Sequence, residues 1–178
     1  MIAAGPALVT AIACERLVEL VLARRNTRRL LARGAVEWGR GHYPLFVLLH
    51  ALWLGAVFAV AVNGAPIHGL ALAALAVLVP LRLWVMISLG PFWTTRIITL
   101  ADAPLVRRGP YRYCRHPNYA VVAAEIAVLP LVFGAWPLAL GFSLVNAGLT
   151  ALRIRVEDHA LEARRAALTA RGRIAGAG

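Results

Sequence analysis

Three long apolar stretches constrain this chain more than any other feature of its sequence. They cover Ile2–Ala23, Tyr43–Val62 and Ile67–Leu89, and each has the length of about 20 residues that an α-helix needs to cross the hydrocarbon core of a bilayer. Hydrophobic residues make up 61% of the 178 residues and charged residues only 15%, whereas soluble domains carry roughly 45–50% and about 25%. The chain is therefore predicted to be an integral membrane protein.

Two shorter apolar segments, Tyr119–Val132 and Pro137–Leu152, follow a polar stretch. Gly134 and Pro137 are turn and helix-start signals, so these segments are predicted to form a tight helical hairpin. The expected fold class is an all-α integral membrane protein with about five transmembrane helices and a C-terminal helical hairpin. The first residues lack the charged region and cleavage site of a signal peptide, so the first apolar stretch is interpreted as a retained span.

The arginines orient this arrangement in the membrane. The chain has no lysine, and its arginines concentrate in residues 24–40, 96–115 and 153–173, while the connections 63–66 and 133–136 have none. Positive charge accumulates in cytoplasmic loops, so five helices with the N-terminus outside place all three Arg-rich segments in the cytoplasm. A multi-pass protein of the cytoplasmic (inner) membrane is expected. Because the arginines lie between apolar spans, no nucleic-acid partner is expected.

The chain is predicted to form a single membrane domain over residues 1–178. Residues 1–90 supply three N-terminal helices, residues 91–165 a connector, the hairpin and a C-terminal helix, and residues 166–178 a tail that is expected to be disordered. The two cysteines lie far apart and have no metal-ligand companions, so neither a metal site nor a redox pair is indicated. The oligomeric state is left open.

Charged side chains inside predicted spans are costly and mark either ion pairs or functional sites. Glu15 and Glu19 are four residues apart and share one face of a helix, where Arg16 can reach Glu19. For these residues an ion pair that holds helices together is favoured over a role in substrate binding. Arg82 in the third span is expected either to pair with one of these glutamates or to face a cavity.

The polar segment Arg107–Tyr119 is the strongest candidate for chemistry. Gly109, Pro110 and Pro117 break helices, so irregular backbone is expected there, and such backbone near a membrane lines a cavity or is buried in protein. An interfacial belt of aromatic and basic residues is the simpler interpretation of this segment. A third polar cluster, Arg153–Glu157, puts a cation and a carboxylate four residues apart on one helical face.

These motifs together resemble the integral-membrane isoprenylcysteine carboxyl methyltransferase family. The resemblance rests on Gly109–Tyr111, on Arg115–Tyr119 and on Arg153–Glu157 after a helical hairpin. In the N-terminal half, Glu15–Glu19 and Leu89–Arg96 are similar to a bacterial subgroup that O-methylates alkylpyrones or alkylresorcinols made by type III polyketide synthases.

The resemblance implies S-adenosylmethionine as cofactor, a pocket for it on the cytoplasmic side, and a lipophilic small molecule as substrate. It further implies that Arg153 is catalytic and addresses the acidic end of the substrate. The residues implied to bind the cofactor are Ala103, Pro104, Leu105, Val106, Tyr111, His116, Pro117, Asn118, Tyr119 and Glu157. Membrane lipid is the other expected partner, since a greasy substrate can enter sideways between helices.

Transfer of a methyl group to an acidic oxygen is thus the expected reaction. Such a displacement needs a positioned nucleophile more than a strong base, and the planar fork of an arginine suits an anion with two oxygens. Three alternatives stay open: a phospholipid N-methyltransferase, an NADPH-dependent membrane reductase, and a transporter or scaffold without enzymatic activity.

Overall fold

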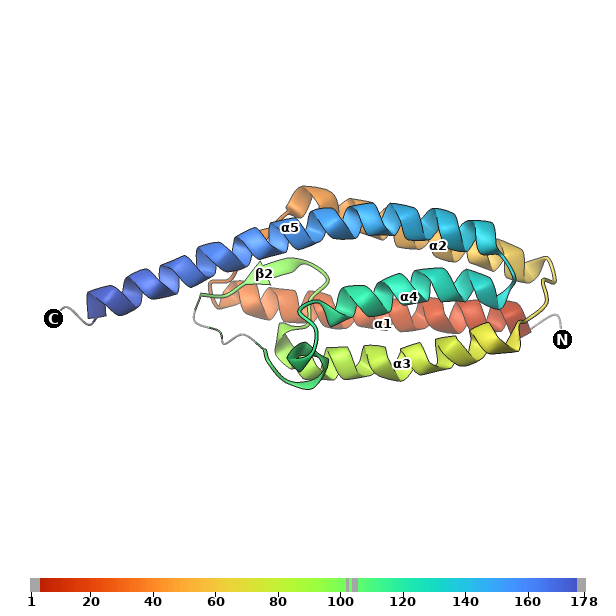
Figure 1. Cartoon of the computed structure of the whole chain (residues 1–178), viewed down its shortest axis with the longest axis horizontal. Helices are drawn as coiled ribbons and strands as arrows, with labels where there is room; N and C mark the ends of the chain where they lie inside the picture. The colour runs from red at the N-terminus through yellow and green to blue at the C-terminus, as the bar shows by residue number, and fades with distance from the viewer. Residues whose placement is uncertain (1–3, 102, 104–105, 176–178) are drawn as a thin grey trace.

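The computed structural model describes residues 4–101, 103 and 106–175, and most of these residues are helical. The α-helices of this part are α1 (Ala4–Ala32), α2 (Tyr43–Val62), α3 (Gly69–Leu89), α4 (Pro117–Val132) and α5 (Trp136–Ala175). They lie roughly along the long axis of the molecule, and α5 extends past the other helices toward the C-terminus (Figure 1). The predicted mostly helical membrane architecture is confirmed at this level.

Three helical stretches in the described part are long and apolar enough to cross a bilayer, namely Arg40–Val62, Gly69–Phe92 and Trp136–Glu162. The predicted first span is not among them, because α1 carries three charged residues within its apolar half. Helix α4 has 16 residues and is about 24 Å long, shorter than the hydrocarbon core of about 30 Å. The total of five spans therefore stays a prediction.

Helix α5 differs from the expectation for the C-terminal half. The hairpin forms, and its turn contains Gly134 with a φ of +67°, a conformation that favours glycine. The second arm, however, does not end near Leu152, because α5 is one helix of 40 residues that continues to Ala175. It passes through the tail for which the sequence predicts disorder. Alanine and arginine, which are frequent in this tail, are strong helix formers.

A small sheet closes one end of the bundle. Strands β1 (Val36–Trp38) and β2 (Ile97–Thr99) pair antiparallel, with Val36 opposite Thr99. Both strands pack against α5, and β2 lies near the point where α5 leaves the other helices (Figure 1). The Trp38 indole N–H donates a hydrogen bond to the Thr99 hydroxyl at 2.8 Å. No strand is expected from the sequence, so this sheet is an addition to the predicted all-α fold.

Three short 3-10 helices complete the connections, at Arg40–His42, Gly90–Phe92 and Gly109–Arg112. The first leads directly into α2 and the second continues from α3. The third, η3 (Gly109–Arg112), packs against α3. It belongs to the stretch for which irregular backbone was predicted, and it brings the polar segment back to the helices.

Apolar side chains hold the helices together in two groups. The larger group joins α1, α2 and α4, with Val9, Trp53 and Ile126 almost fully buried. The smaller group lies toward the other end and contains Ala23 and Trp93. A large part of the remaining apolar surface is exposed on the helices, which suits contact with lipid tails rather than water.

Four charged side chains form a network between α1, α3 and α4. The Arg82 guanidinium binds the carboxylates of Glu19 and Glu125, and Arg16 binds the same two carboxylates at 2.9 and 2.8 Å. Two cations thus face two anions, so the network is neutral as a group. The predicted ion-pair interpretation is confirmed for Arg16, Glu19 and Arg82. Glu125 was not singled out from the sequence, because it has no charged neighbour along its own helix.

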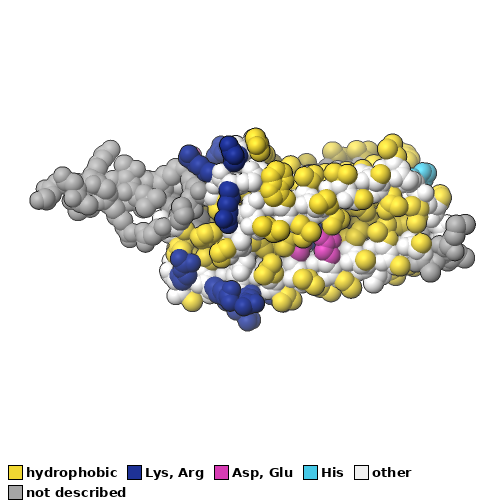
Figure 2. Space-filling view, turned by 90° about the horizontal axis from the view of Figure 1, so that it is seen from below, with side chains coloured by type: hydrophobic (Ala, Val, Ile, Leu, Met, Phe, Trp, Pro, Cys, Tyr) yellow, Lys and Arg dark blue, Asp and Glu magenta, His cyan; other side chains and the backbone are white. Residues whose placement is uncertain are grey.

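Charge is distributed unevenly over the surface. On the face shown in Figure 2, the arginines gather at the end from which α5 extends, and the rest of that face is mostly hydrophobic. This distribution agrees with the predicted placement of the Arg-rich segments on one side of a membrane. That this side is the cytoplasmic one stays a prediction.

Candidate functional site

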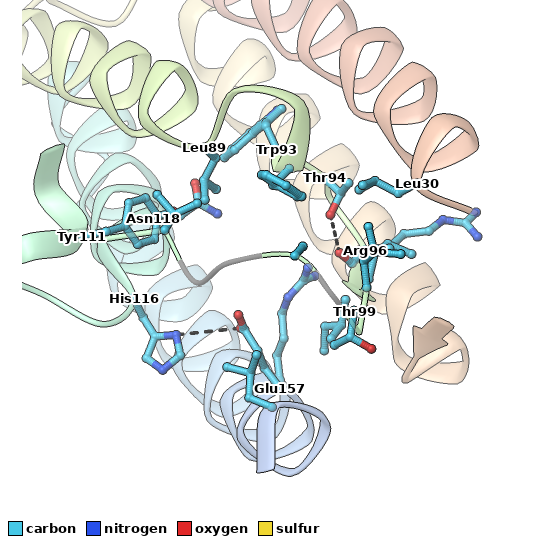
Figure 3. A pocket seen from close by; sticks show the side chains of 18 of the residues that line it. Leu30, Leu89, Trp93, Thr94, Arg96, Thr99, Tyr111, His116, Asn118 and Glu157 are labelled. Carbon is cyan, nitrogen blue, oxygen red and sulfur yellow. Dashed lines mark hydrogen bonds and ion pairs between the residues drawn. The ribbon is translucent and has the colours of Figure 1, made fainter. Parts of the chain in front are cut away.

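A pocket of about 230 Å³ lies at the Arg-rich end, between β2, the start of α4 and the middle of α5 (Figure 3). Polar and ionisable side chains meet apolar ones on its walls. The polar residues are Thr94, Arg96, Thr99, Tyr111, Arg115, His116, Asn118, Tyr119, Arg153 and Glu157. The apolar ones are Leu30, Leu89, Phe92, Ile97, Ile98, Leu100, Ala103, Val106 and Leu161, and Trp93 adds an indole ring with one polar N–H group.

A carboxylate, a phenol and a guanidinium form the centre of the polar wall. The Tyr119 hydroxyl donates a hydrogen bond to a Glu157 carboxylate oxygen at 2.5 Å and accepts one from Arg153 Nε at 2.9 Å. Tyr119 comes from the first turn of α4, whereas Arg153 and Glu157 lie one turn apart on α5. The hairpin between α4 and α5 therefore brings together two motifs that are far apart in sequence.

Further contacts fix the position of the Arg153 side chain. Its Nη2 donates a hydrogen bond to the backbone carbonyl of Thr95 at 2.8 Å, and its guanidinium lies 5.2 Å from the ring centre of Phe46. Arg153 is only 9% exposed. A buried guanidinium with rigid neighbours is a pre-organised binding site for an anion.

His116 lies beside the central carboxylate. Its ring stacks on Tyr119 with the ring centres 5.4 Å apart, and its Nδ1 is 3.8 Å from a Glu157 carboxylate oxygen, as the dashed line in Figure 3 shows. Pro117 follows as the first residue of α4, a position that suits proline because the first helical N–H needs no partner. The imidazole of His116 is thereby held at the N-terminus of α4.

Tyr111 reaches the pocket from η3. Gly109 has a φ of +58°, and a side-chain carbon there would come within 2.1 Å of the Ser88 hydroxyl, so only glycine lets η3 lie this close to α3. Burial raises the pKa of the Tyr111 phenol well above its usual range, and the negative charge of Glu157 adds to this effect. The phenol therefore stays protonated and able to donate a hydrogen bond at physiological pH.

The opposite wall contains Trp93, which the sequence did not identify as a site residue. Its side chain is 2% exposed, and its backbone carbonyl accepts a hydrogen bond from the buried Asn26 amide of α1 at 2.9 Å. The guanidinium of Arg82 lies 5.9 Å from the ring centre. The segment Leu89–Arg96, which carries part of the subgroup resemblance, thus contributes to this wall, and Arg82 connects it to Glu19.

Most of the predicted site residues meet around this one pocket. Those that line it are Ala103, Val106, Tyr111, His116, Asn118, Tyr119, Arg153 and Glu157. Pro117 is buried next to the pocket without lining it, and Pro104 and Leu105 lie outside the described residues. The predicted convergence of His116, Tyr119 and Glu157 is confirmed. Their roles toward a ligand stay predictions.

The sequence missed the pocket residues contributed by β2 and its neighbours. Arg96 and Thr99 line the pocket, and Arg96 is bound by Glu37 of β1 at 2.9 Å while lying over the Tyr43 ring at 4.8 Å. The only signal for Arg96 was the motif Leu89–Arg96, to which no role was assigned, and Thr99 lies outside that motif. Within the described part of the chain, no group of three or more His, Cys, Asp or Glu side chains is placed to hold a metal ion.

Comparison with known proteins identifies the family. The model of the isoprenylcysteine carboxyl methyltransferase (ICMT) family matches residues 70–163, which include α3, η3, α4 and the pocket-lining part of α5. The chain is similar to the uncharacterized protein YpbQ of Bacillus subtilis, with 37% identity over 160 residues that cover 87% of this chain and 95% of the relative.

A second relative is an uncharacterized protein of Haemophilus influenzae, with 26% identity over 151 residues that cover 82% of this chain and 88% of the relative. No solved structure matches the chain significantly. Because the family match spans more than half of the chain and includes the residues that meet at the pocket, the protein belongs to the isoprenylcysteine carboxyl methyltransferase family, whose members are membrane methyltransferases that use S-adenosylmethionine.

Proposed function

We propose that this protein transfers a methyl group from S-adenosylmethionine to an acidic oxygen of a lipophilic small molecule. The observation that carries this proposal is the contact of Tyr119 with both Glu157 and Arg153 inside one pocket. One wall thereby offers a carboxylate for a cationic ligand and a guanidinium for an anionic one. A sulfonium cofactor and an acidic acceptor are such a pair.

The residues of the pocket fit the proposed cofactor. S-adenosylmethionine carries an ammonium group and a sulfonium, which a carboxylate and aromatic faces attract. Glu157 supplies the carboxylate, and Tyr111, His116 and Tyr119 supply the aromatic rings. Within the described part of the chain, three buried polar atoms of pocket residues also lack a hydrogen-bond partner, namely Trp93 Nε1, His116 Nε2 and Asn118 Oδ1. Such atoms are costly in an empty pocket and are typical of a site that a polar ligand completes.

In this proposal Arg153 binds the anionic acceptor. When bound, S-adenosylmethionine supplies an electrophilic methyl group, to which an oxygen lone pair bonds while the carbon–sulfur bond breaks and its electrons stay on sulfur. For a carboxylate or an acidic enol, Arg153 needs no proton transfer in this role, because it orients an oxygen that is already anionic. A resorcinol hydroxyl has in addition to release its proton to water before or during the transfer. Tyr119 and the Thr95 carbonyl hold the guanidinium in place, so the acceptor binds a pre-oriented group.

The apolar lining of the pocket and the apolar outer surface support a lipophilic substrate. Leu30, Phe92 and Leu161 are among the lining residues, and a substrate with a hydrocarbon tail can leave that tail in the bilayer. An alkylpyrone or alkylresorcinol is the preferred acceptor, because the Glu15–Glu19 and Leu89–Arg96 motifs are similar to that subgroup. A carboxylate like that of an isoprenylcysteine is the other member of the class. The pocket is proposed to face the cytoplasm, where the cofactor is made.

The test is a methylation assay with labelled S-adenosylmethionine and the purified protein in lipid nanodiscs. Acceptors of four kinds separate the candidates: an alkylresorcinol, an alkylpyrone, an isoprenylated cysteine derivative and phosphatidylethanolamine. Label in one of the first three supports the proposal, and label in the last indicates an N-methyltransferase. Binding of NADPH without methyl transfer would indicate a reductase, and binding of neither cofactor a transporter or scaffold.

A matched pair of variants checks the site. We expect Arg153→Gln to lower kcat/KM for an acidic acceptor by about 10²-fold, because a charge-assisted hydrogen bond contributes about 1.5–3 kcal/mol. Arg155→Gln changes an exposed arginine on the same helix and should leave kcat/KM unchanged. Equal activity of the two variants would refute the role assigned to Arg153.

A further inference from the structure

The pocket has two chemically different ends. Four of its ionisable groups lie together, since His116, Arg153 and Glu157 contact one another through Tyr119. Trp93 and Asn118 lie on the wall across the pocket from Glu157 (Figure 3). These two side chains are polar but uncharged, and Leu89 and Tyr111 lie beside them. We call Trp93 and Asn118 the neutral end.

The neutral end holds two unused hydrogen-bonding atoms of opposite kind. The Trp93 indole N–H is a donor and the Asn118 side-chain oxygen is an acceptor, and both are buried without a hydrogen-bond partner among the residues that the structure describes. A buried donor or acceptor without a partner costs free energy, so an empty neutral end is unfavourable. A second buried tryptophan does have a hydrogen-bond partner. The indole N–H of Trp53 donates to the backbone carbonyl of Ile126 at 3.2 Å.

The Trp93 ring is also held firmly in its place. The buried Asn26 amide fixes its backbone from α1, and the Arg82 guanidinium lies over its ring from α3. Arg82 is itself fixed by Glu19 and Glu125. The unused N–H therefore cannot easily turn away to find a partner, and it is pre-organised for an acceptor atom of a ligand.

Resting on the proposed function, we propose that the neutral end binds the nucleobase of the cofactor, and that Trp93 is the residue that donates a hydrogen bond to a ring nitrogen of the adenine. Adenine is the uncharged, flat part of S-adenosylmethionine, and its edges offer ring nitrogens as acceptors and an amino group as donor. The charged amino-acid part then lies toward Glu157. Charge complementarity favours this orientation, because the reverse would put an ammonium and a carboxylate against groups that cannot neutralise them.

Trp93→Phe tests the proposal with Trp53→Phe as matched control, since each removes one indole N–H and keeps an aromatic ring. The probe is S-adenosylhomocysteine, whose binding to the protein in nanodiscs is measured by calorimetry. We expect Trp93→Phe to weaken binding about three- to tenfold, the effect of one neutral hydrogen bond, and Trp53→Phe to leave binding unchanged. Unchanged binding by Trp93→Phe would overturn the proposal.

Thermal stability without ligand gives an independent readout. Both substitutions leave a cavity in a buried site, but Trp53→Phe also breaks a satisfied hydrogen bond, whereas Trp93→Phe removes an unsatisfied donor, so Trp53→Phe should lower the unfolding midpoint more. An equal or larger loss for Trp93→Phe would show that its N–H serves the fold instead of a ligand.

Ligand analogues test the proposal on the wild-type protein, whatever the variants do. Removing the accepting ring nitrogen in 1-deaza, 3-deaza or 7-deaza S-adenosylhomocysteine should weaken binding for one of the three, and that loss should disappear in Trp93→Phe. Equal binding of all three analogues and the parent compound would overturn the proposal. Failure of the parent compound to bind at all would instead refute the proposed function, so the two failures are distinguishable.

Discussion

At the scale of single residues, Tyr119 connects the charged groups of the pocket. Its hydroxyl contacts a carboxylate and a guanidinium at once, and its ring stacks on His116. No other described side chain bonds to both Arg153 and Glu157. The phenol thus sets the spacing between the group proposed to bind the cofactor and the group proposed to bind the acceptor.

Tyr119→Phe is therefore expected to lower methyl transfer about ten- to a hundredfold, because hydrogen bonds to charged groups contribute about 1.5–3 kcal/mol each. The ring and its stacking on His116 are kept, so the loss reports on the hydroxyl alone. Steady-state kinetics with varied cofactor and varied acceptor measure the effect. Tyr113→Phe is the control, since Tyr113 is 81% exposed and lies outside the pocket lining. Wild-type kinetics for Tyr119→Phe would contradict the assigned role.

At the scale of elements, the charged network connects α1, α3 and α4 below the pocket. Removing one partner leaves an unpaired buried charge, which typically costs about 3–5 kcal/mol, whereas an apolar replacement of a whole pair is much less costly. The network allows a clean test because its charges balance. If Arg82 and Glu125 are removed together, Arg16 and Glu19 remain as a bonded pair.

We expect Arg82→Met and Glu125→Leu each to destabilise the protein by about 3–5 kcal/mol. The double variant should be destabilised by clearly less than the sum of the two. Unfolding midpoints in detergent, together with the yield of folded protein, measure these effects. Additive losses would show that the two side chains do not act as a pair.

The sequence predicted some elements well and others not at all. Helix α2 follows from an apolar stretch of the right length, α3 follows from another in which Arg82 is the one charged residue, and the α4–α5 turn follows from Gly134. The pairing of β1 with β2 joins three-residue strands about 60 positions apart, and such short strands carry no periodic signal. The end of α5 was missed because composition alone does not separate a helical Ala/Arg-rich tail from a disordered one.

The site could be predicted only where its residues belong to motifs with a strong local pattern. Gly109–Tyr111, Arg115–Tyr119 and Arg153–Glu157 supply most of the polar lining, and their resemblance to a known family indicated them. Trp93 belongs to the motif Leu89–Arg96, to which no role was assigned, and Glu125 belongs to no motif. The position of each depends on partners from other helices. A contact between distant elements becomes visible only when the chain is folded.

At the scale of the whole molecule, the uneven charge of the surface predicts an orientation. The pocket lies at the Arg-rich end, so a cytoplasmic pocket requires that this end face inward. The connection between α2 and α3 lies near the opposite end of the bundle (Figure 1) and carries no arginine. The two ends should therefore differ in their access to reagents that cannot cross the membrane.

Cysteine labelling tests this orientation. With Cys14 replaced by alanine, the exposed Cys114 should react with a membrane-impermeable maleimide in inside-out vesicles and not in intact spheroplasts. In a chain without either native cysteine, Asn63→Cys should show the reverse pattern. Labelling of Cys114 from the outside would contradict the cytoplasmic placement of the pocket.

The uninterrupted course of α5 links the pocket to the bilayer mechanically. The same rigid helix contains an apolar stretch long enough to cross a membrane and carries Arg153 and Glu157 near the end of that stretch. A helix adapts to the thickness of its membrane by tilting, and any tilt of α5 shifts both side chains relative to Tyr119 on α4. The geometry of methyl transfer is therefore expected to depend on the chain length of the surrounding lipids.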